Sequence, residues 1–266
     1  MKKIELQKVE HNCKIGDTCS YITPNITEDA IFYQDGKPIG FYLSKLPERA
    51  SKLADLANNE FRSKNVPKTY LDRMETVKYS KIGMSRSDAR KIGVSQMSTI
   101  LGSVPPKPVM RRPYPTISSV HSVKSAQIFI KAMIMLAKES EQIMAEILPE
   151  QYKRQIEIFK DVPDKWKLAN LFTSSISNYN ISAPYHRDTG NLEGTVNVII
   201  CKKFNSKGGD LNIPDFGATI GQEDNSMLVY PVWQNIHGVT PIIPTHEGGY
   251  RNSLVFYPLK AFKGLQ

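Results

Sequence analysis

The chain has 266 residues, of which 40% are hydrophobic and 23% are charged, a balance typical of a soluble globular protein and unlike that of a disordered or fibrous one. Its length favours one large domain, or one domain with an appended lobe. No window of 18 uninterrupted apolar residues occurs, and the first residues lack the apolar run of a secretory signal. We therefore expect a cytoplasmic protein without a membrane partner.

The formal net charge of +9 predicts a polyanionic partner. The excess is localised, because residues 62–112 contain twelve basic and three acidic residues, which alone account for +9, whereas residues 121–266 are nearly neutral. Aromatic and hydroxyl side chains lie between these basic residues, a mixture that suits nucleic acid. A solvated basic surface without a ligand is the alternative interpretation.

The cysteines Cys13, Cys19 and Cys201 are odd in number and contain no C-x-x-C spacing. This pattern fits neither a disulfide framework nor a zinc knuckle. Free or buried thiols are expected.

In chain order, residues 29–43 predict a hairpin of two short strands that turns at Asp35-Gly36. Residues 46–62 predict a helix that begins after Pro47. Residues 103–115 contain five prolines and predict an extended connector, the best internal boundary. We expect a mixed, basic region over 1–120 that belongs to the same globule, and a catalytic core over 121–266.

The core begins with a predicted long helix over 122–148, with Ser122 or Ser125 as its N-cap, Met133 and Met135 in its packed face, and Pro149 after its end. A shorter helix is expected at 150–160. Short strands are predicted over 172–179, 195–201, 210–213, 226–232 and 253–257. Such closely spaced strands indicate a sandwich or barrel, so the fold class is α+β.

Candidate metal ligands lie in the β region. Alternation along an extended chain places His186 and Asp188 on one face, and His237 follows three plausible strands later. Two histidines and one carboxylate leave positions open on the metal, the arrangement that suits non-haem Fe(II). Zinc is the weaker alternative because no cysteine ligand or H-E-x-x-H helix is present.

A candidate anion clamp lies on the last strand, where alternation places Arg251 and Ser253 on one face. A guanidinium beside a hydroxyl suits a carboxylate. Gly208-Gly209 precedes Asp210-Leu211 and predicts a tight turn that reverses the chain inside the barrel.

The order H-x-D, Gly-Gly-Asp-Leu, His-Gly-Val and Arg-x-Ser resembles the Fe(II)- and 2-oxoglutarate-dependent dioxygenases. Residues 170–178, His186-Arg187-Asp188, residues 191–194 and residues 251–257 are similar to the TET/JBP branch, including its viral members. The resemblance implies a double-stranded β-helix, a jelly roll, with supporting helices packed on one sheet and an N-terminal mixed extension. For a viral member, the location would be the host-cell cytoplasm.

The resemblance also implies residue roles. His186, Asp188 and His237 would bind Fe(II), and Arg251 and Ser253 would hold the distal carboxylate of 2-oxoglutarate, with O2 as the second cosubstrate. The alternative is that these residues bind no ligand. His186 would then be a turn histidine, Asp188 a cap, His237 a histidine of the barrel and Arg251 a surface cation. His11, His121 and His246 are expected at the surface.

Candidate substrate contacts are the polar side chains near the expected mouth of the barrel. Asn178, Asn191 and Asn197 could contact a pyrimidine edge, and Tyr185 or Trp233 could stack on a base. Turn formation and rim packing are the structural alternatives.

Three alternative functions are consistent with these features of the sequence. The first is hydroxylation of the 5-methyl group of thymine or 5-methylcytosine in DNA, with the base extruded and the DNA backbone held by basic residues, namely Arg86, Arg90, Lys91, Arg111 and Arg112. The second is a 2-oxoglutarate oxygenase that acts on a protein side chain, an RNA base or a metabolite. The third is a non-catalytic barrel that binds DNA or a partner. No obligate protein partner is evident.

Overall fold

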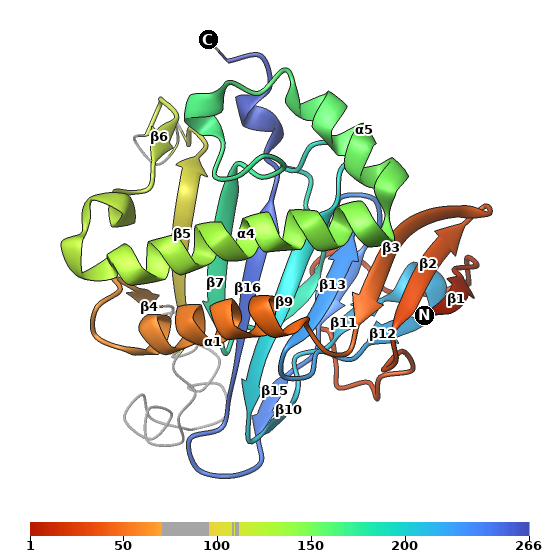
Figure 1. Cartoon of the computed structure of the whole chain (residues 1–266). Coiled ribbons are helices and arrows are strands. Elements are labelled where there is room, and N and C mark those ends of the chain that lie inside the picture. Colours follow the sequence, from red (N-terminus) through yellow and green to blue (C-terminus); the bar gives the residue numbers. More distant parts are fainter. Residues whose placement is uncertain (71–95, 108, 110–111, 266) are drawn as a thin grey trace.

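The computed structural model describes residues 1–70, 96–107, 109 and 112–265. Two facing sheets and three longer helices make up the architecture of this described part (Figure 1). The major sheet has ten strands there, in the order β1-β2-β3-β13-β9-β16-β7-β5-β4, with β6 paired to β5. In that order the strands are Lys2–Glu5, Ala30–Gln34, Lys37–Leu43, Ser226–Tyr230, Asn197–Phe204, Tyr250–Tyr257, Ser174–Tyr179, Met97–Val104 and Thr69–Tyr70, and β6 is Thr116–Ile117.

The minor sheet has the order β12-β11-β14-β8, formed by Ala218–Ile220, Leu211–Ile213, His237–Val239 and Ala183–His186. A separate antiparallel pair joins β10, Ser206–Gly208, to β15, Ile242–Pro244. Apolar side chains from both sheets, among them Tyr42, Leu211, Ile220 and Leu228, form one buried cluster. The two sheets therefore face each other across a common interior, as in a double-stranded β-helix.

Helices cover the outer face of the major sheet, as expected. α1, Glu48–Arg62, and α4, Gln127–Ile147, cross its strands, and α5, Pro149–Phe159, follows α4 (Figure 1). Strand alternation determines which residues meet them. On β9 and β16, Ile200 and Leu254 join the core beneath the helices, whereas Ile199 and Val255 face the interior.

The local predictions for the first half are confirmed in their main elements. β2 and β3 form the hairpin, and Asp35 and Gly36 have φ angles of 52° and 71°, the left-handed pair that a two-residue turn of this type requires. α1 begins directly after Pro47. The proline-rich connector lies between β5 and β6, which pair with each other, so it is the loop of a hairpin.

Two details of the long helix differ from the prediction. Neither Ser122 nor Ser125 caps α4, because short 3-10 turns occupy Ser119–Ser122 and Lys124–Ala126 and the N-cap is Ala126. Met133 is buried, but Met135 is 47% exposed, so its assignment to the core was wrong. The face of α4 that packs on the sheet therefore includes fewer residues than the apolar positions in its sequence suggest.

The three cysteines are free, as expected. Among the residues that the structure describes, none of the helices combines the length and the apolarity needed to cross a bilayer.

Candidate metal centre and cosubstrate site

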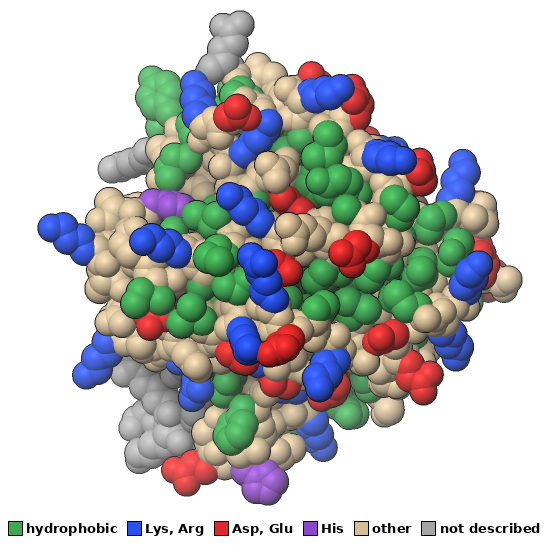
Figure 2. All heavy atoms as spheres, in the orientation of Figure 1, with side chains coloured by type: hydrophobic (Ala, Val, Ile, Leu, Met, Phe, Trp, Pro, Cys, Tyr) green, Lys and Arg blue, Asp and Glu red, His purple; other side chains and the backbone are tan. Residues whose placement is uncertain are grey.

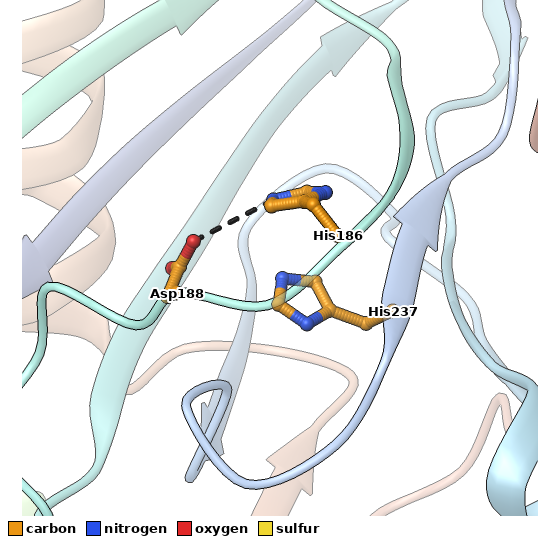
Figure 3. Close-up of side chains that lie close together, drawn as sticks. All are labelled: His186, Asp188 and His237. Carbon is orange, nitrogen blue, oxygen red and sulfur yellow. Dashed lines mark ion pairs between the residues drawn. The ribbon is translucent and has the colours of Figure 1, made fainter. Parts of the chain in front are cut away.

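Three predicted ligands converge at the mouth of the interior. His186 ends β8, Asp188 lies in the following loop, and His237 begins β14 (Figure 3). The register of β8 and β14 pairs His186 directly with His237, so the two imidazoles are cross-strand neighbours with ring centroids 4.4 Å apart. One potential ligand atom from each of the three residues lies within 4.8 Å of the others.

Backbone carbonyl groups orient both imidazoles. His186 Nδ1 lies 2.7 Å from the carbonyl oxygen of Pro184, and His237 Nδ1 lies 3.1 Å from that of Asn235. A carbonyl oxygen only accepts, so each Nδ1 donates, and in a neutral imidazole Nε2 then carries the free lone pair. This second hydrogen bond is typical of histidines that bind metals.

The surroundings of His237 favour its neutral imidazole. Burial, with a further contribution from His186, lowers the pKa of His237, which is only 3% exposed. The Asp188 carboxylate lies 3.5 Å from His186 Nε2. Two imidazole nitrogens and one carboxylate form a donor set that fits Fe(II).

A cavity of about 370 Å³ adjoins these ligands and lies between the two sheets. Walls come from β7, β9 and β16 on one side and β8, β11 and β14 on the other. Apolar side chains such as Ile176, Ile199 and Val255 dominate its lining, a composition usual for a pocket that takes a small molecule.

Arg251 and Ser253 line this same cavity from one face of β16. Arg251 is 4% exposed and has no ion-pair partner in the described part of the chain, and its Nε has no hydrogen-bond partner there. The nearby Asp210 carboxylate interacts with Arg251 without forming an ion pair, and a buried guanidinium without a direct ion pair is unfavourable unless an anion binds to it. The site therefore fits a carboxylate ligand such as that of 2-oxoglutarate.

Close packing positions the arginine. Gly209 has a φ of 74°, and a Cβ atom there would lie 3.1 Å from Arg251 Cδ. The Arg251 backbone is held by Asn180, whose Oδ1 accepts from Arg251 N and whose N donates to Arg251 O. The Gly-Gly turn predicted from the sequence thus leaves room for the arginine side chain.

The three candidate asparagines also line the cavity, from β7, the loop after Asp188 and β9. Asn191 Nδ2 donates to Asn197 Oδ1 at 2.9 Å, and both side chains are buried. Asn178 lies opposite Ser253 in the pairing of β7 with β16.

Other candidates lie elsewhere. Tyr185 and Trp233 are not among the residues that line the cavity, because Tyr185 alternates to the face opposite His186 and bonds Asn212, while Trp233 Nε1 donates to Thr195 O. His246 is exposed, and His11 and His121 are partly exposed and hydrogen-bonded.

Of the predicted DNA-backbone residues, Arg112 lies near the β5–β6 hairpin, where it lines a groove with Lys68 and several hydroxyl side chains. Arg86, Arg90, Lys91 and Arg111 lie outside the described residues.

Sequence reasoning missed Gln222, which lines the cavity between β12 and β13. Its loop carries no pattern that separates it from an ordinary turn. The apolar wall residues Ile199 and Val255 could have been predicted from the sequence, because each is two positions along its strand from another residue that faces the interior.

Comparison with known proteins identifies a family and a fold. The family model "Tet_JBP: Oxygenase domain of the 2OGFeDO superfamily" matches residues 106–260, more than half of the chain. No curated protein sequence matches this chain.

Among solved structures, NgTET1 in complex with 5mC DNA is similar over 96% of this chain and 85% of that chain, with 15% identity and a TM-score of 0.58. A 2OG-Fe(II) oxygenase family protein from Caulobacter crescentus is 13% identical over 83% of this chain and 77% of that chain, with a TM-score of 0.44. The superfamily uses Fe(II), 2-oxoglutarate and O2, and the site described above fits these groups. The chain therefore belongs to the TET/JBP family and is a 2-oxoglutarate-dependent dioxygenase.

Proposed function

We propose that the protein hydroxylates the 5-methyl group of a pyrimidine base, thymine or 5-methylcytosine, in DNA. The observation that carries the proposal is the shared cavity that adjoins His186, Asp188 and His237 and also contains Arg251 and the asparagines. Metal, cosubstrate and substrate can meet there, as this reaction requires.

In this proposal, His186 and His237 hold Fe(II) through Nε2, and Asp188 holds it through a carboxylate oxygen. The bound metal, together with 2-oxoglutarate and O2, supplies the oxidising chemistry. Arg251 binds the distal carboxylate of 2-oxoglutarate, and Ser253 donates a further hydrogen bond to it. The protein mainly positions these groups and limits access of water.

The substrate assignment rests on the shape and polarity of the cavity. Apolar walls suit a methyl group, and an Asn191–Asn197 pair offers both a donor and an acceptor beyond its internal hydrogen bond. A pyrimidine edge requires such a mixed set. Asn178 is a further candidate for the same role.

In this proposal the base leaves the duplex, because a methyl group in the major groove of intact DNA could not reach a cavity between two sheets. In support, the solved structure of NgTET1 holds 5mC DNA, and this chain has a similar fold. We assign the backbone contacts to the basic residues of 62–112, with Arg86, Arg90, Lys91, Arg111 and Arg112 as candidates.

Mass spectrometry of nucleosides tests the proposal. DNA that contains thymine and 5-methylcytosine is incubated with the protein, Fe(II) and 2-oxoglutarate, and the expected product is a 5-hydroxymethylpyrimidine together with succinate. His237→Ala is the inactive control. Succinate formation without any modified nucleoside, on duplex or single-stranded DNA, would reject DNA and favour a protein side chain, an RNA base or a metabolite.

A further inference from the structure

Gln222 is a buried polar side chain that the assignments above do not use. The residue is 0% exposed, and neither Oε1 nor Nε2 has a hydrogen-bond partner among the described residues. Buried amides are almost always hydrogen-bonded, because an unpaired donor or acceptor gives up its hydrogen bonds to water without replacement. An unpaired carboxamide in a cavity wall therefore indicates a missing ligand.

The Gln222 backbone is firmly held. Its N–H donates to Asp210 Oδ1 at 2.9 Å, and its carbonyl accepts from Cys201 Sγ at 3.2 Å. Both partners are buried, Cys201 on β9 and Asp210 directly before β11. The side chain therefore projects from a fixed point and not from a loose loop.

Sheet register places Gln222 at the Arg251 end of the cavity. Cys201, which donates to the Gln222 carbonyl, lies directly opposite Ser253 in the pairing of β9 with β16. The Arg251 guanidinium also lies close enough to Cys201 to interact with its thiol. Arg251, Ser253 and Gln222 thus surround one cysteine side chain.

The charges at this end favour an anion. Lys203 pairs with Glu223 at 3.3 Å and approaches Asp210 at 4.0 Å, whereas Arg251 forms no ion pair among the described residues and interacts with the Asp210 carboxylate only at longer range. A carboxylate offers four acceptor sites, more than a guanidinium and one hydroxyl fill. A carboxamide N–H beside them is a suitable third donor.

We propose that Gln222 is a cosubstrate-binding residue whose side-chain NH2 donates a hydrogen bond to the distal carboxylate of 2-oxoglutarate, beside Arg251 and Ser253. This inference rests on the cosubstrate site assigned under the proposed function and is independent of DNA as substrate. Rotation about the terminal side-chain torsion presents the NH2 group, since the amide has no hydrogen bond that fixes it among the described residues.

Direct binding tests this role. The full chain is loaded with Mn(II), and calorimetry measures the Kd of 2-oxoglutarate and of 2-oxobutyrate, which has the same oxo-acid end but no distal carboxylate. Gln222→Met keeps the length of the side chain and removes its hydrogen bonds. Gln222→Glu places a like charge beside the carboxylate. Gln151→Met, which removes an amide of α5 outside the cavity, is the matched control.

Gln222→Met should raise the Kd of 2-oxoglutarate about tenfold or more, because a hydrogen bond to a charged group is removed, and leave the Kd of 2-oxobutyrate within about twofold. Gln222→Glu should weaken 2-oxoglutarate further, and Gln151→Met should change neither ligand. The ligand-free Gln222→Met protein should melt at the same or a higher temperature, because an unpaired buried amide is removed.

Equal weakening of both ligands by Gln222→Met, or an unchanged Kd for 2-oxoglutarate, would overturn the inference. A lower melting temperature of the ligand-free variant would indicate a structural role and would also overturn it. Because no DNA is present in these titrations, failure here is distinguishable from failure of the DNA-hydroxylase proposal, which nucleoside analysis tests separately.

Discussion

At the residue scale, a backbone carbonyl group orients each of the two imidazoles of the candidate metal centre. Carbonyl oxygens of Pro184 and Asn235 accept from the Nδ1 atoms, which leaves the Nε2 atoms as the candidate metal-binding atoms. Asp188 completes the donor set and lies 3.5 Å from His186 Nε2. The protein itself thus orients both imidazoles of the candidate metal centre.

Removal of one imidazole should therefore weaken metal binding strongly. We expect His186→Ala to lower Mn(II) or Fe(II) affinity by more than the roughly 10–100-fold typical of removing an outer partner of a metal ligand. Calorimetry with Mn(II) measures the effect, and His246→Ala, in an exposed loop, is the control. Unchanged metal affinity in the His186 variant would remove this residue from the ligand set.

Two glycines allow a second test of the cosubstrate site. Gly209 and Gly248 have φ angles of 74° and 73°, but a Cβ atom at Gly209 would press on Arg251 whereas one at Gly248 would meet nothing within 4 Å. Alanine at either position should destabilise the fold by about 1–2 kcal/mol through backbone strain. Only Gly209→Ala should also weaken 2-oxoglutarate binding, by about tenfold. An equal loss of 2-oxoglutarate affinity in both variants would show that Arg251 does not bind the cosubstrate.

At the scale of elements, strand alternation divides β9 and β16 between two tasks. One face of each strand packs under α1 and α4, and the other face lines the cavity. Lys202 on the outer face of β9 pairs with Asp55 of α1 at 2.7 Å, while Ile199 on the inner face lines the cavity. The helices thus support the site without entering it.

Two methionines of α4 allow a test of how this helix packs on the major sheet. Met133 is fully buried and Met135 is 47% exposed. Met133→Ala should lower the free energy of unfolding by about 2–5 kcal/mol, whereas Met135→Ala should change it by less than about 0.5 kcal/mol. Urea denaturation measures both, and comparable decreases would contradict the packing of α4 described above.

Glu141 of α4 predicts a pH effect on stability. Burial raises the pKa of its carboxyl group, and hydrogen bonds from Leu171 N and Asn170 Nδ2 only partly oppose this. Since the folded protein holds this proton more tightly than the unfolded chain, the contribution of Glu141 to stability falls as pH rises from the ordinary value of 4.5 through the raised pKa.

Glu141→Gln cannot ionise, so its free energy of unfolding relative to the unmodified protein should increase over that pH interval. Urea denaturation at stepped pH values measures the difference. A difference that stays flat, or that falls with rising pH, would show that the carboxylate is well accommodated.

At the scale of the whole molecule, positive charge and catalytic interior lie in different parts of the chain. The helix-covered face has basic and acidic side chains interspersed, without a gathering of one sign among the residues described (Figure 2). The excess of +9 comes from residues 62–112, partly outside the described residues. DNA affinity should therefore depend on that segment and not on the helices.

Charge reversal tests this separation. Arg86, Arg90, Arg111 and Arg112 changed to Glu should weaken DNA binding and reduce the slope of log K against log salt, by about 0.9 for each phosphate that is no longer neutralised. Four exposed lysines of α4 and α5 and their ends, Lys131, Lys138, Lys153 and Lys160, changed to Glu form the matched control, and should retain the slope. The same slope in both variants would reject residues 62–112 as the DNA-binding segment.

The sequence by itself determined the local elements and the chemistry-bearing residues. Asp35-Gly36, Pro47 and Pro149 mark turns and helix ends through backbone preferences that act over a few residues. His186, Asp188, His237 and Arg251 stood out because their residue types suit a metal and an anion.

Only the tertiary structure decided which side chains share the cavity. His186 and His237 are 51 positions apart and become neighbours through the register of β8 with β14. Gln222 lies in a loop without any motif, and Tyr185 is turned away from the cavity by alternation on its strand. Such placements depend on pairings between distant segments, which no local pattern of residues specifies.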